Sequence, residues 1–250
     1  MPSWSGRPSR PLRALLLLLL LILVAGGLWA AGRVAGLYAG EPPAPAHRLP
    51  DALPAPGTGP FRIVALGTSL TARGDWPDSL GTRLSACAGR PVTVERVAKA
   101  GAGSNWGRDQ AAAVLALSPD LVLIEFAIND ADLRDGVSLA RARDNHLALI
   151  AALEAGRPGL PLMLMTMNGA EGLRGLMRPW LAAHHAQYRD LAAGRGSGLI
   201  DLAPLWAAAF AAGRGPELLP DGLHPTDAAV AEIALPVMAA EIGRLLPGCS

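Results

Sequence analysis

The chain has 250 residues, of which 51% are hydrophobic, 17% charged and 4% aromatic, and its 22 Lys and Arg nearly balance its 21 Asp and Glu. This length supports one medium-sized domain with a buried core and a short appendage. Low charge and high apolar content exclude a disordered chain, and the lack of a basic excess argues against a nucleic-acid partner. Two cysteines are too few for a Cys-rich zinc site.

The N-terminal segment differs in character from the rest. Residues 1–40 contain four Arg and no acidic residue, which leaves 18 basic against 21 acidic residues in the other 210. The uncharged run 14–32 follows three of these Arg and includes seven consecutive leucines. A helix of this length spans roughly 28 Å, close to the thickness of a bilayer core. We therefore predict a basic cytoplasmic N-terminus over 1–13 and a transmembrane signal-anchor over 14–32, with the folded domain on the periplasmic side of the inner membrane.

A cleaved signal peptide is the alternative, with residues 15–24 as its apolar core and a cut near 25–31. The protein is then secreted or periplasmic. Under both interpretations the folded domain lies outside the cytoplasm. Residues 33–60 form a Pro-rich linker, because positions 41–60 hold seven Pro without apolar periodicity, a composition typical of a stiff spacer. The folded domain is expected over 61–250.

From residue 61 onward, apolar runs alternate with helical patterns. The predicted strands are 61–66, 92–98, 121–126, 161–167 and 199–202. The predicted helices are 76–88, 108–117, 138–155, 179–193 and 226–246, with Asp75 and Thr226 as N-caps, Pro179 in a first turn and a kink at Pro236. This alternation predicts an α/β fold, a three-layer α/β/α sandwich around a central, flavodoxin-like parallel sheet of five strands.

Polar and Gly-bearing segments lie at the expected ligand-binding edge of such a sheet, beyond the carboxyl ends of the strands. They are 67–71 (GTSLT), 101–105 (GAGSN), 127–130 (AIND) and 221–225 (DGLHP). Together they supply a hydroxyl group, a carboxylate–imidazole pair, a side-chain amide and glycine N–H groups. Acyl transfer through a tetrahedral oxyanion needs these groups.

In this order the four segments resemble the conserved blocks of the SGNH (GDSL-type) hydrolase and esterase family. The resemblance covers residues 61–250. It departs at Thr68, where the family usually has Asp, and at Ala127, where it usually has Gly. Neither position has a chemical role in the family, so activity is expected, while the subfamily stays open.

The resemblance implies a role for each site residue. Ser69 would attack the ester carbonyl, His224 would accept its proton and return it to the leaving group, and Asp221 would orient the imidazole. The N–H groups of Ser69 and Gly103 and the side-chain amide of Asn129 would form the oxyanion hole. Individually these residues are ordinary turn and cap formers. Their joint occurrence favours the enzymatic interpretation.

No cofactor or metal is expected. The glycines at 101, 103 and 107 follow the second strand at a spacing that departs from the dinucleotide fingerprint, and no residues have metal-ligand spacing. The other histidines (His47, His146, His184 and His185) are interpreted as structural. Trp106 either lines an acyl or sugar pocket or packs in the core.

The two cysteines are expected close together. If the first strand is central in the sheet, the helices that end near Cys87 and Cys249 pack side by side, away from the site. An exported domain permits a disulfide between them, the alternative being two free thiols.

We therefore predict a serine hydrolase that cleaves carboxylic esters with short acyl groups through an acyl-enzyme. Its partner would be an ester-bearing small molecule or an acylated polysaccharide, with residues 168–178 and 211–220 shaping the pocket. The alternatives are an O-acyltransferase acting on envelope polysaccharide and a non-catalytic glycan-binding module. The sequence leaves the oligomeric state open.

Overall fold

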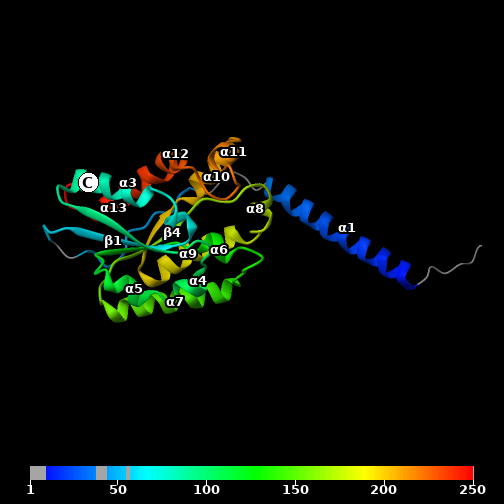
Figure 1. Cartoon of the computed structure of the whole chain (residues 1–250), viewed down its shortest axis with the longest axis horizontal. Coiled ribbons are helices and arrows are strands. Elements are labelled where there is room, and N and C mark those ends of the chain that lie inside the picture. Colours follow the sequence, from blue (N-terminus) through cyan, green and yellow to red (C-terminus); the bar gives the residue numbers. More distant parts are fainter. Residues whose placement is uncertain (1–9, 38–43, 55–56, 250) are drawn as a thin grey trace, which may run out of the picture. The chain divides into compact units, whose positions relative to one another are not determined.

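The computed structural model describes residues 10–37, 44–54 and 57–249 (Figure 1). The chain divides into two units, residues 1–42 and 43–250, each described here by itself. The first contains helix α1 (Arg10–Leu37), on which the predicted membrane segment falls. Within the described residues, which exclude the side chains of 10, 12, 13 and 30–37, none of the helices combines the length and apolar content of a membrane span. Residues 1–9 of the predicted N-terminus and 38–43 and 55–56 of the predicted linker lie outside the described residues.

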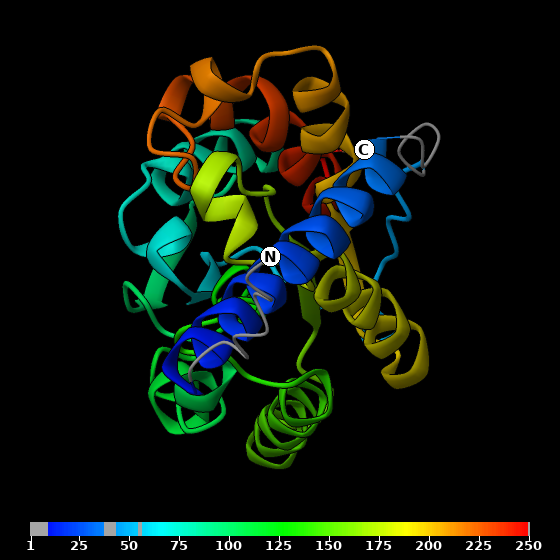
Figure 2. The same cartoon turned by 90° about the vertical axis from the view of Figure 1, so that its right-hand side faces the viewer.

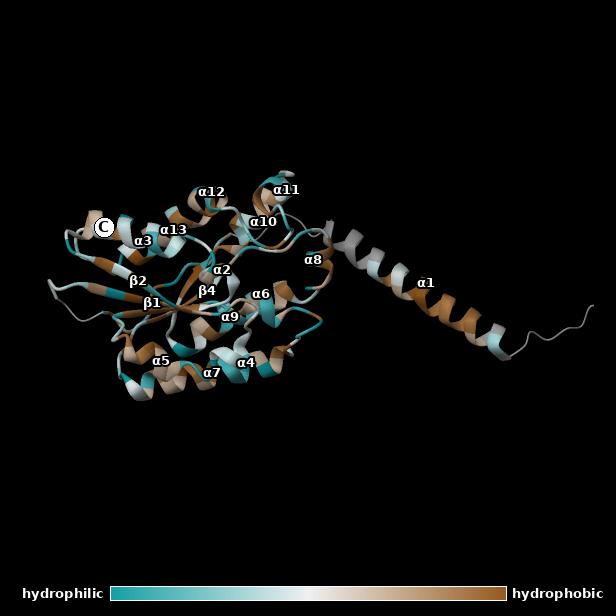
Figure 3. Cartoon of the chain, in the orientation of Figure 1, coloured by the Kyte–Doolittle hydropathy of each residue, from teal (hydrophilic) through white to brown (hydrophobic). Residues whose placement is uncertain are grey.

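The second unit is built on five parallel strands in the order β2-β1-β3-β4-β5, which confirms the flavodoxin-like sheet. They are β1 (Phe61–Gly67), β2 (Val92–Ala98), β3 (Leu121–Ile124), β4 (Leu162–Thr166) and β5 (Gly198–Asp201). Every residue of β3, β4 and β5 is buried, as expected for strands covered on both faces. Figure 3 shows the corresponding hydrophobic colouring at the centre of this unit.

Helices cover both faces of the sheet (Figures 1 and 2), which confirms the three-layer architecture. One layer contains α3 (Trp76–Ala88), α10 (Ala203–Ala211) and α13 (Leu235–Gly243), and the other α5 (Ala111–Ala116), α7 (Leu139–Gly156) and α9 (Leu181–Arg195). Short helices follow β1 to β4, namely α2 (Ser69–Ala72), α4 (Ser104–Gly107), α6 (Ala127–Asp130) and α8 (Gly172–Leu176). Two more, α11 (Gly215–Leu218) and α12 (Asp227–Ala229), come after α10.

Several predicted helix ends need correction. Asp75 occupies the N-cap position of α3 but makes no capping hydrogen bond with its side chain. Helix α9 begins at Leu181, so Pro179 precedes the helix instead of lying in its first turn. Helix α5 begins three residues later than predicted.

The last predicted helix is interrupted rather than simply kinked. Thr226 caps it as expected, because its hydroxyl accepts the N–H of Ala229 at 3.1 Å. A π-helical turn (Val230–Ala234) then precedes α13, which has Pro236 in its first turn and ends at Gly243. In this turn the N–H of Leu235 bonds to the carbonyl of Val230, five residues earlier, and the wider turn directly precedes Pro236, which has no N–H to donate.

Part of the predicted linker belongs to the folded unit. Arg48 forms an isolated antiparallel bridge with Leu199 of β5, with N–O distances of 3.0 and 2.7 Å in the two directions. The N–H of Ala46 also donates to Asp201, and the N–H of Asp201 donates to the His47 ring. This segment therefore covers the edge strand of the sheet, and the folded unit begins before residue 61. The high proline content of residues 41–60 predicted a spacer and gave no sign of this pairing with β5.

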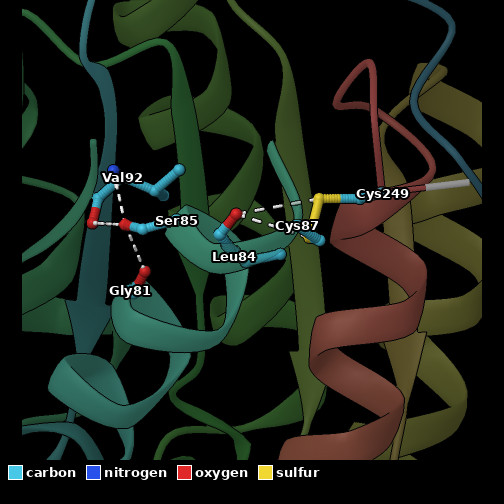
Figure 4. The surroundings of a disulfide bond; sticks show 6 residues. All are labelled: Gly81, Leu84, Ser85, Cys87, Val92 and Cys249. Atoms are coloured by element: carbon cyan, nitrogen blue, oxygen red, sulfur yellow. Dashed lines mark hydrogen bonds between the residues drawn. A yellow bond between two sulfur atoms is a disulfide. The ribbon is translucent and has the colours of Figure 1, made fainter. Parts of the chain in front are cut away.

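Cys87 and Cys249, the pair proposed from the sequence, form a disulfide with a Cα–Cα distance of 4.8 Å (Figure 4). Cys87 lies near the end of α3, and Cys249 follows α13. Nearby, the hydroxyl of Ser85 accepts the N–H of Val92 at 2.8 Å, which ties the end of α3 to the start of β2. The bridge thus lies at the amino-terminal edge of the sheet.

Candidate active site

The opposite, carboxyl-terminal edge of the sheet, which faces the viewer in Figure 2, gathers the polar segments. Ser69 is the first residue of α2, directly after β1, and Gly103 is the N-cap of α4, after β2. Asn129 lies in α6, after β3. His224 precedes α12 and reaches Ser69 across 155 residues of sequence. Parallel strands bring these segments together because all five end at this edge.

Ser69, His224 and Asp221 form a connected hydrogen-bonded series. The Ser69 hydroxyl lies 2.9 Å from Nε2 of His224, and Nδ1 of His224 lies 2.7 Å from Oδ2 of Asp221. The second carboxylate oxygen of Asp221 accepts the backbone N–H groups of Leu223 and His224 at 2.9 and 2.7 Å. This compact turn fixes the carboxylate against its own imidazole.

The electrostatics of Asp221 determine the imidazole tautomer. Partial burial acts to raise the pKa of Asp221, but the hydrogen bonds from the His224 ring and from the N–H groups of His224 and Leu223 outweigh it and hold the pKa at about 2. An ionised carboxylate only accepts hydrogen bonds. Nδ1 of His224 therefore carries the proton, and Nε2 faces Ser69 as an acceptor.

The three donors that the sequence predicts for an oxyanion hole lie on the turns that follow β1, β2 and β3, at the same edge of the sheet. Among the described residues, the N–H groups of Ser69 and Gly103 have no acceptor. The side-chain amide of Asn129 donates one hydrogen to the carbonyl of Ala102 at 2.9 Å, which leaves the other free. Unpaired donors of this kind are suited to a charge that develops only during reaction.

Asp130 holds the Gly103 loop from beneath. Its Oδ1 accepts the N–H of Ser104 at 2.7 Å, and the side chain is 1% exposed. Burial raises the pKa of Asp130 to about 6 against the hydrogen bonds from Ser104. Asn129 and Asp130 thus fix the residues on both sides of Gly103.

A known protein family matches most of the folded unit. Residues 65–231 match the profile described as GDSL-like Lipase/Acylhydrolase family. The chain belongs to this family. As a GDSL-like acylhydrolase it is a carboxylic ester hydrolase. The sequence has no significant match among curated proteins.

Solved structures show the same fold. The lipase/acylhydrolase from Enterococcus faecalis is 24% identical, with a TM-score of 0.65 over 75% of this chain and 98% of its own. A catalytic mutant of an acetylxylan esterase from Geobacillus stearothermophilus is 19% identical, with a TM-score of 0.60 over 77% and 96%. An alpha/beta hydrolase enzyme from the metagenome of Lake Arreo, Spain, is also 19% identical, with a TM-score of 0.60 over 78% and 98%.

This GDSL-like chain has a small cavity that two of the candidate oxyanion residues, Gly103 and Asn129, help to line, whereas Ser69 and His224 do not. Its volume is about 270 Å³. The residues that line it are Lys99, Ala100, Gly101, Ala102, Gly103, Asn105, Trp106, Asn129, Asp135 and Val137. Trp106 satisfies both interpretations of the sequence, because it lines the cavity and also packs edge-on against Phe126, with ring centroids 6.3 Å apart.

Two buried polar residues at the site were not identified from the sequence. The side-chain amide of Asn168 donates to the carbonyl of Leu223 at 2.8 Å and so holds the His224 turn. Glu125 accepts the N–H of Thr68 at 2.6 Å, beneath the Ser69 turn. Glu125 interrupts the apolar run 121–128 and Asn168 follows another, which is the only signal the sequence carries for them.

The remaining histidines of α7 and α9 have structural surroundings. Nδ1 of His146 lies 2.7 Å from the carbonyl of Ala142, and Nε2 lies 2.9 Å from the hydroxyl of Tyr188. Burial lowers the pKa of His146 to about 4. His184 and His185 are also buried. Over the described part of the chain, no group of His, Cys, Asp or Glu side chains is arranged to hold a metal ion.

Proposed function

We propose that this enzyme hydrolyses carboxylic esters with Ser69 as nucleophile and His224 as general base and acid. The observation that carries the proposal is the continuous contact from Ser69 through His224 to Asp221, at 2.9 and 2.7 Å. As the Ser69 oxygen attacks the carbonyl carbon, its proton moves to Nε2 of His224. The ionised Asp221 stabilises the imidazolium that forms.

The tetrahedral intermediate places a negative charge on the former carbonyl oxygen. The N–H groups of Ser69 and Gly103 and the Asn129 amide donate to it, and it collapses as His224 protonates the leaving alcohol. Water activated by His224 then hydrolyses the acyl-enzyme and regenerates the Ser69 hydroxyl. Each donor contributes on the order of 10²–10³ in turnover.

We propose a short acyl group and a polar alcohol for the substrate. A cavity of about 270 Å³ lies just below the usual range of ligand pockets, roughly 300–1,000 Å³. Lys99, Asn105 and Asp135 give it charged and amide walls, and Trp106 adds an aromatic face. Such walls suit a hydroxyl-bearing sugar better than an alkyl chain, because an alkyl chain would leave the polar groups without partners. Acetylated oligosaccharides are therefore the proposed substrate class.

We also propose that the enzyme works outside the cytoplasm, held at a membrane or released after cleavage of its leader. The disulfide between Cys87 and Cys249 supports an oxidising compartment. The leucines from Leu15 to Leu21 on α1 are between 48% and 65% exposed, an apolar surface that a bilayer or a translocation channel would cover. Fractionation of epitope-tagged protein, before and after an alkaline wash, tests this proposal.

Turnover of p-nitrophenyl esters from acetate to octanoate, together with acetylated xylooligosaccharides, tests the proposed reaction. We expect the highest kcat/KM with acetyl esters and loss of turnover in Ser69→Ala and His224→Ala. Ser79→Ala, on the outer part of α3, is the matched control and should remain active. Free acid as the product supports hydrolysis, product that depends on a sugar acceptor indicates acyl transfer, and glycan binding that persists in Ser69→Ala indicates a binding module.

A further inference from the structure

Glu125 is a buried carboxylate to which the proposed reaction assigns no step. It directly follows β3, is 1% exposed, and lies beneath the turn that follows the neighbouring strand β1. Its Oε1 accepts the N–H of Thr68 at 2.6 Å and the hydroxyl of Thr71 at 2.7 Å. The hydroxyl of Thr68 lies 3.0 Å from both carboxylate oxygens. Three donors from the nucleophile turn therefore converge on a single acceptor group.

The network extends from Glu125 to the residue after the nucleophile. Because the Thr68 hydroxyl donates its hydrogen to Glu125, its oxygen is free to accept the N–H of Leu70, at 3.2 Å. The N–H groups on both sides of Ser69 thus have acceptors within the network. The N–H of Ser69 itself is left for the oxyanion.

Gly67 provides the space that this arrangement needs. A Cβ at this position would overlap the Glu125 carboxylate and would lie 2.7 Å from the Thr71 hydroxyl. Glycine is therefore required here for space, since its φ is not positive. The strand end, the turn and Glu125 form one packed unit.

We propose that Glu125 is a positioning residue whose ionised form sets the Ser69 turn for attack, which makes the enzyme sensitive to pH through a group remote from the reacting atoms. The inference rests on the proposed function of Ser69. An ionised Glu125 accepts all three donors. A protonated Glu125 must itself donate. With the proton on Oε2, the acceptor is the Thr68 hydroxyl at 3.0 Å, which then has to turn its own hydrogen away from the carboxylate. Protonation therefore removes the hydrogen bond that the Thr68 hydroxyl donates to Glu125.

The surroundings of Glu125 place its protonation near neutral pH. Burial raises the pKa of Glu125 to about 7, against the hydrogen bonds from Thr68 and Thr71. The facing titratable groups are Asp130 of α6, whose charge raises the Glu125 pKa further, and Tyr188 of α9, which is neutral across this range because burial raises its own pKa. Glu125 is consequently ionised above neutral pH and protonated below it.

The test is the pH profile of kcat and KM of the full chain on p-nitrophenyl acetate, for wild type and Glu125→Gln. Glu154→Gln, an exposed glutamate of α7 paired with Arg195 at 2.9 Å, is the matched control. We expect Glu125→Gln to lower kcat about 10–100-fold at pH 8 with little change in KM. In addition to the acid limb that the general base gives in every variant, we expect the wild-type profile to show an inflection near pH 7 that Glu125→Gln lacks and Glu154→Gln keeps.

Thr71→Val provides a second test should Glu125→Gln fail to fold. Losing one donor to the carboxylate raises the Glu125 pKa, so the inflection should move up by about one pH unit. An acid limb of the same shape in wild type, Glu125→Gln and Thr71→Val would overturn the inference, even if all are less active. Fluorophosphonate labelling of wild type distinguishes failure of the two proposals. If Ser69 is not labelled, both the proposed function and the role of Glu125 are wrong. If Ser69 is labelled but the variants have the same pH profile as wild type, only the role of Glu125 is wrong.

Discussion

At the scale of single residues, Gly103 lies where a side chain has no room. A Cβ there would lie 2.7 Å from Oδ1 of Asp130, the oxygen that accepts the N–H of Ser104. Real Cβ atoms essentially never approach so closely. A side chain at 103 must therefore move Asp130, and with it the loop that presents the Gly103 N–H.

Gly103→Ala should lower kcat by about 10²–10³, the usual cost of losing one oxyanion donor, with a smaller effect on KM. Steady-state kinetics on p-nitrophenyl acetate measure this. Gly194→Ala is the matched control, because a Cβ in that part of α9 would meet nothing within 4 Å. Equal kcat in both variants would contradict the role assigned to the Gly103 loop.

Glu125 should also make stability depend on pH. Its pKa is raised from 4.5 to about 7 in the folded chain, so between these values the folded state binds the extra proton and stability falls as pH rises. The difference corresponds to about 3 kcal/mol. Urea unfolding at pH 5 and pH 8 should show wild type losing more stability than Glu125→Gln over this interval. Parallel losses in the two proteins would argue against a buried ionisation at this position.

At the scale of secondary-structure elements, Arg178 joins α8 to α6. Its guanidinium lies 2.7 Å from Asp132, and both side chains are almost fully buried. Nε of Arg178 also donates to the carbonyl of Ile128, beside Asn129, at 2.7 Å. The pair thus connects the segment that follows α8 to the segment that carries Asn129.

Arg178→Met should destabilise the protein by about 3 kcal/mol, because it leaves the buried Asp132 with only the more exposed Arg134 as a cation and the Ile128 carbonyl unpaired. Urea unfolding measures the loss. Replacing Asp132 by Asn in addition should cost less than the sum of the two single changes. Strictly additive costs would show that the pair does not act as a unit.

The elements also show how far the sequence predicts this fold. All five strands and helix α3 were predictable from local sequence. Short apolar runs indicate the strands, and an apolar face at helical spacing indicates α3. The short helices α2, α4 and α6 were not predictable. Each is a single turn, and such a turn is stabilised by tertiary contacts, such as the one between Glu125 and Thr68, that leave no local pattern in the sequence. Ser69, Asp221 and His224 stand in recognisable segments, whereas the partners of Glu125 lie 54 and 57 positions away in the sequence.

At the scale of the whole molecule, the disulfide and the site lie at opposite edges of the sheet. Helices α3 and α13 both run from the site edge to the edge where Cys87 and Cys249 meet. The bridge closes a loop between cysteines 162 positions apart. It therefore restrains the unfolded chain without touching the catalytic residues.

Replacing both Cys87 and Cys249 by Ser should lower stability by about 3–5 kcal/mol and leave kcat at 25 °C unchanged. Chemical unfolding with and without reductant, alongside ester kinetics, checks both halves of this expectation. Reductant should lower the stability of wild type and leave that of the double variant unchanged. A large fall in kcat in the folded double variant would show that the two edges are coupled.

The assignment of Ser69 as the nucleophile is the central claim. The full chain, purified in mild detergent, is treated with a fluorophosphonate, and the modified peptide is sequenced by mass spectrometry. Our account predicts one label, on Ser69, that is absent in Ser69→Ala and strongly slowed in His224→Ala. A well-folded wild type that takes no label, or a label that persists in Ser69→Ala, would contradict it.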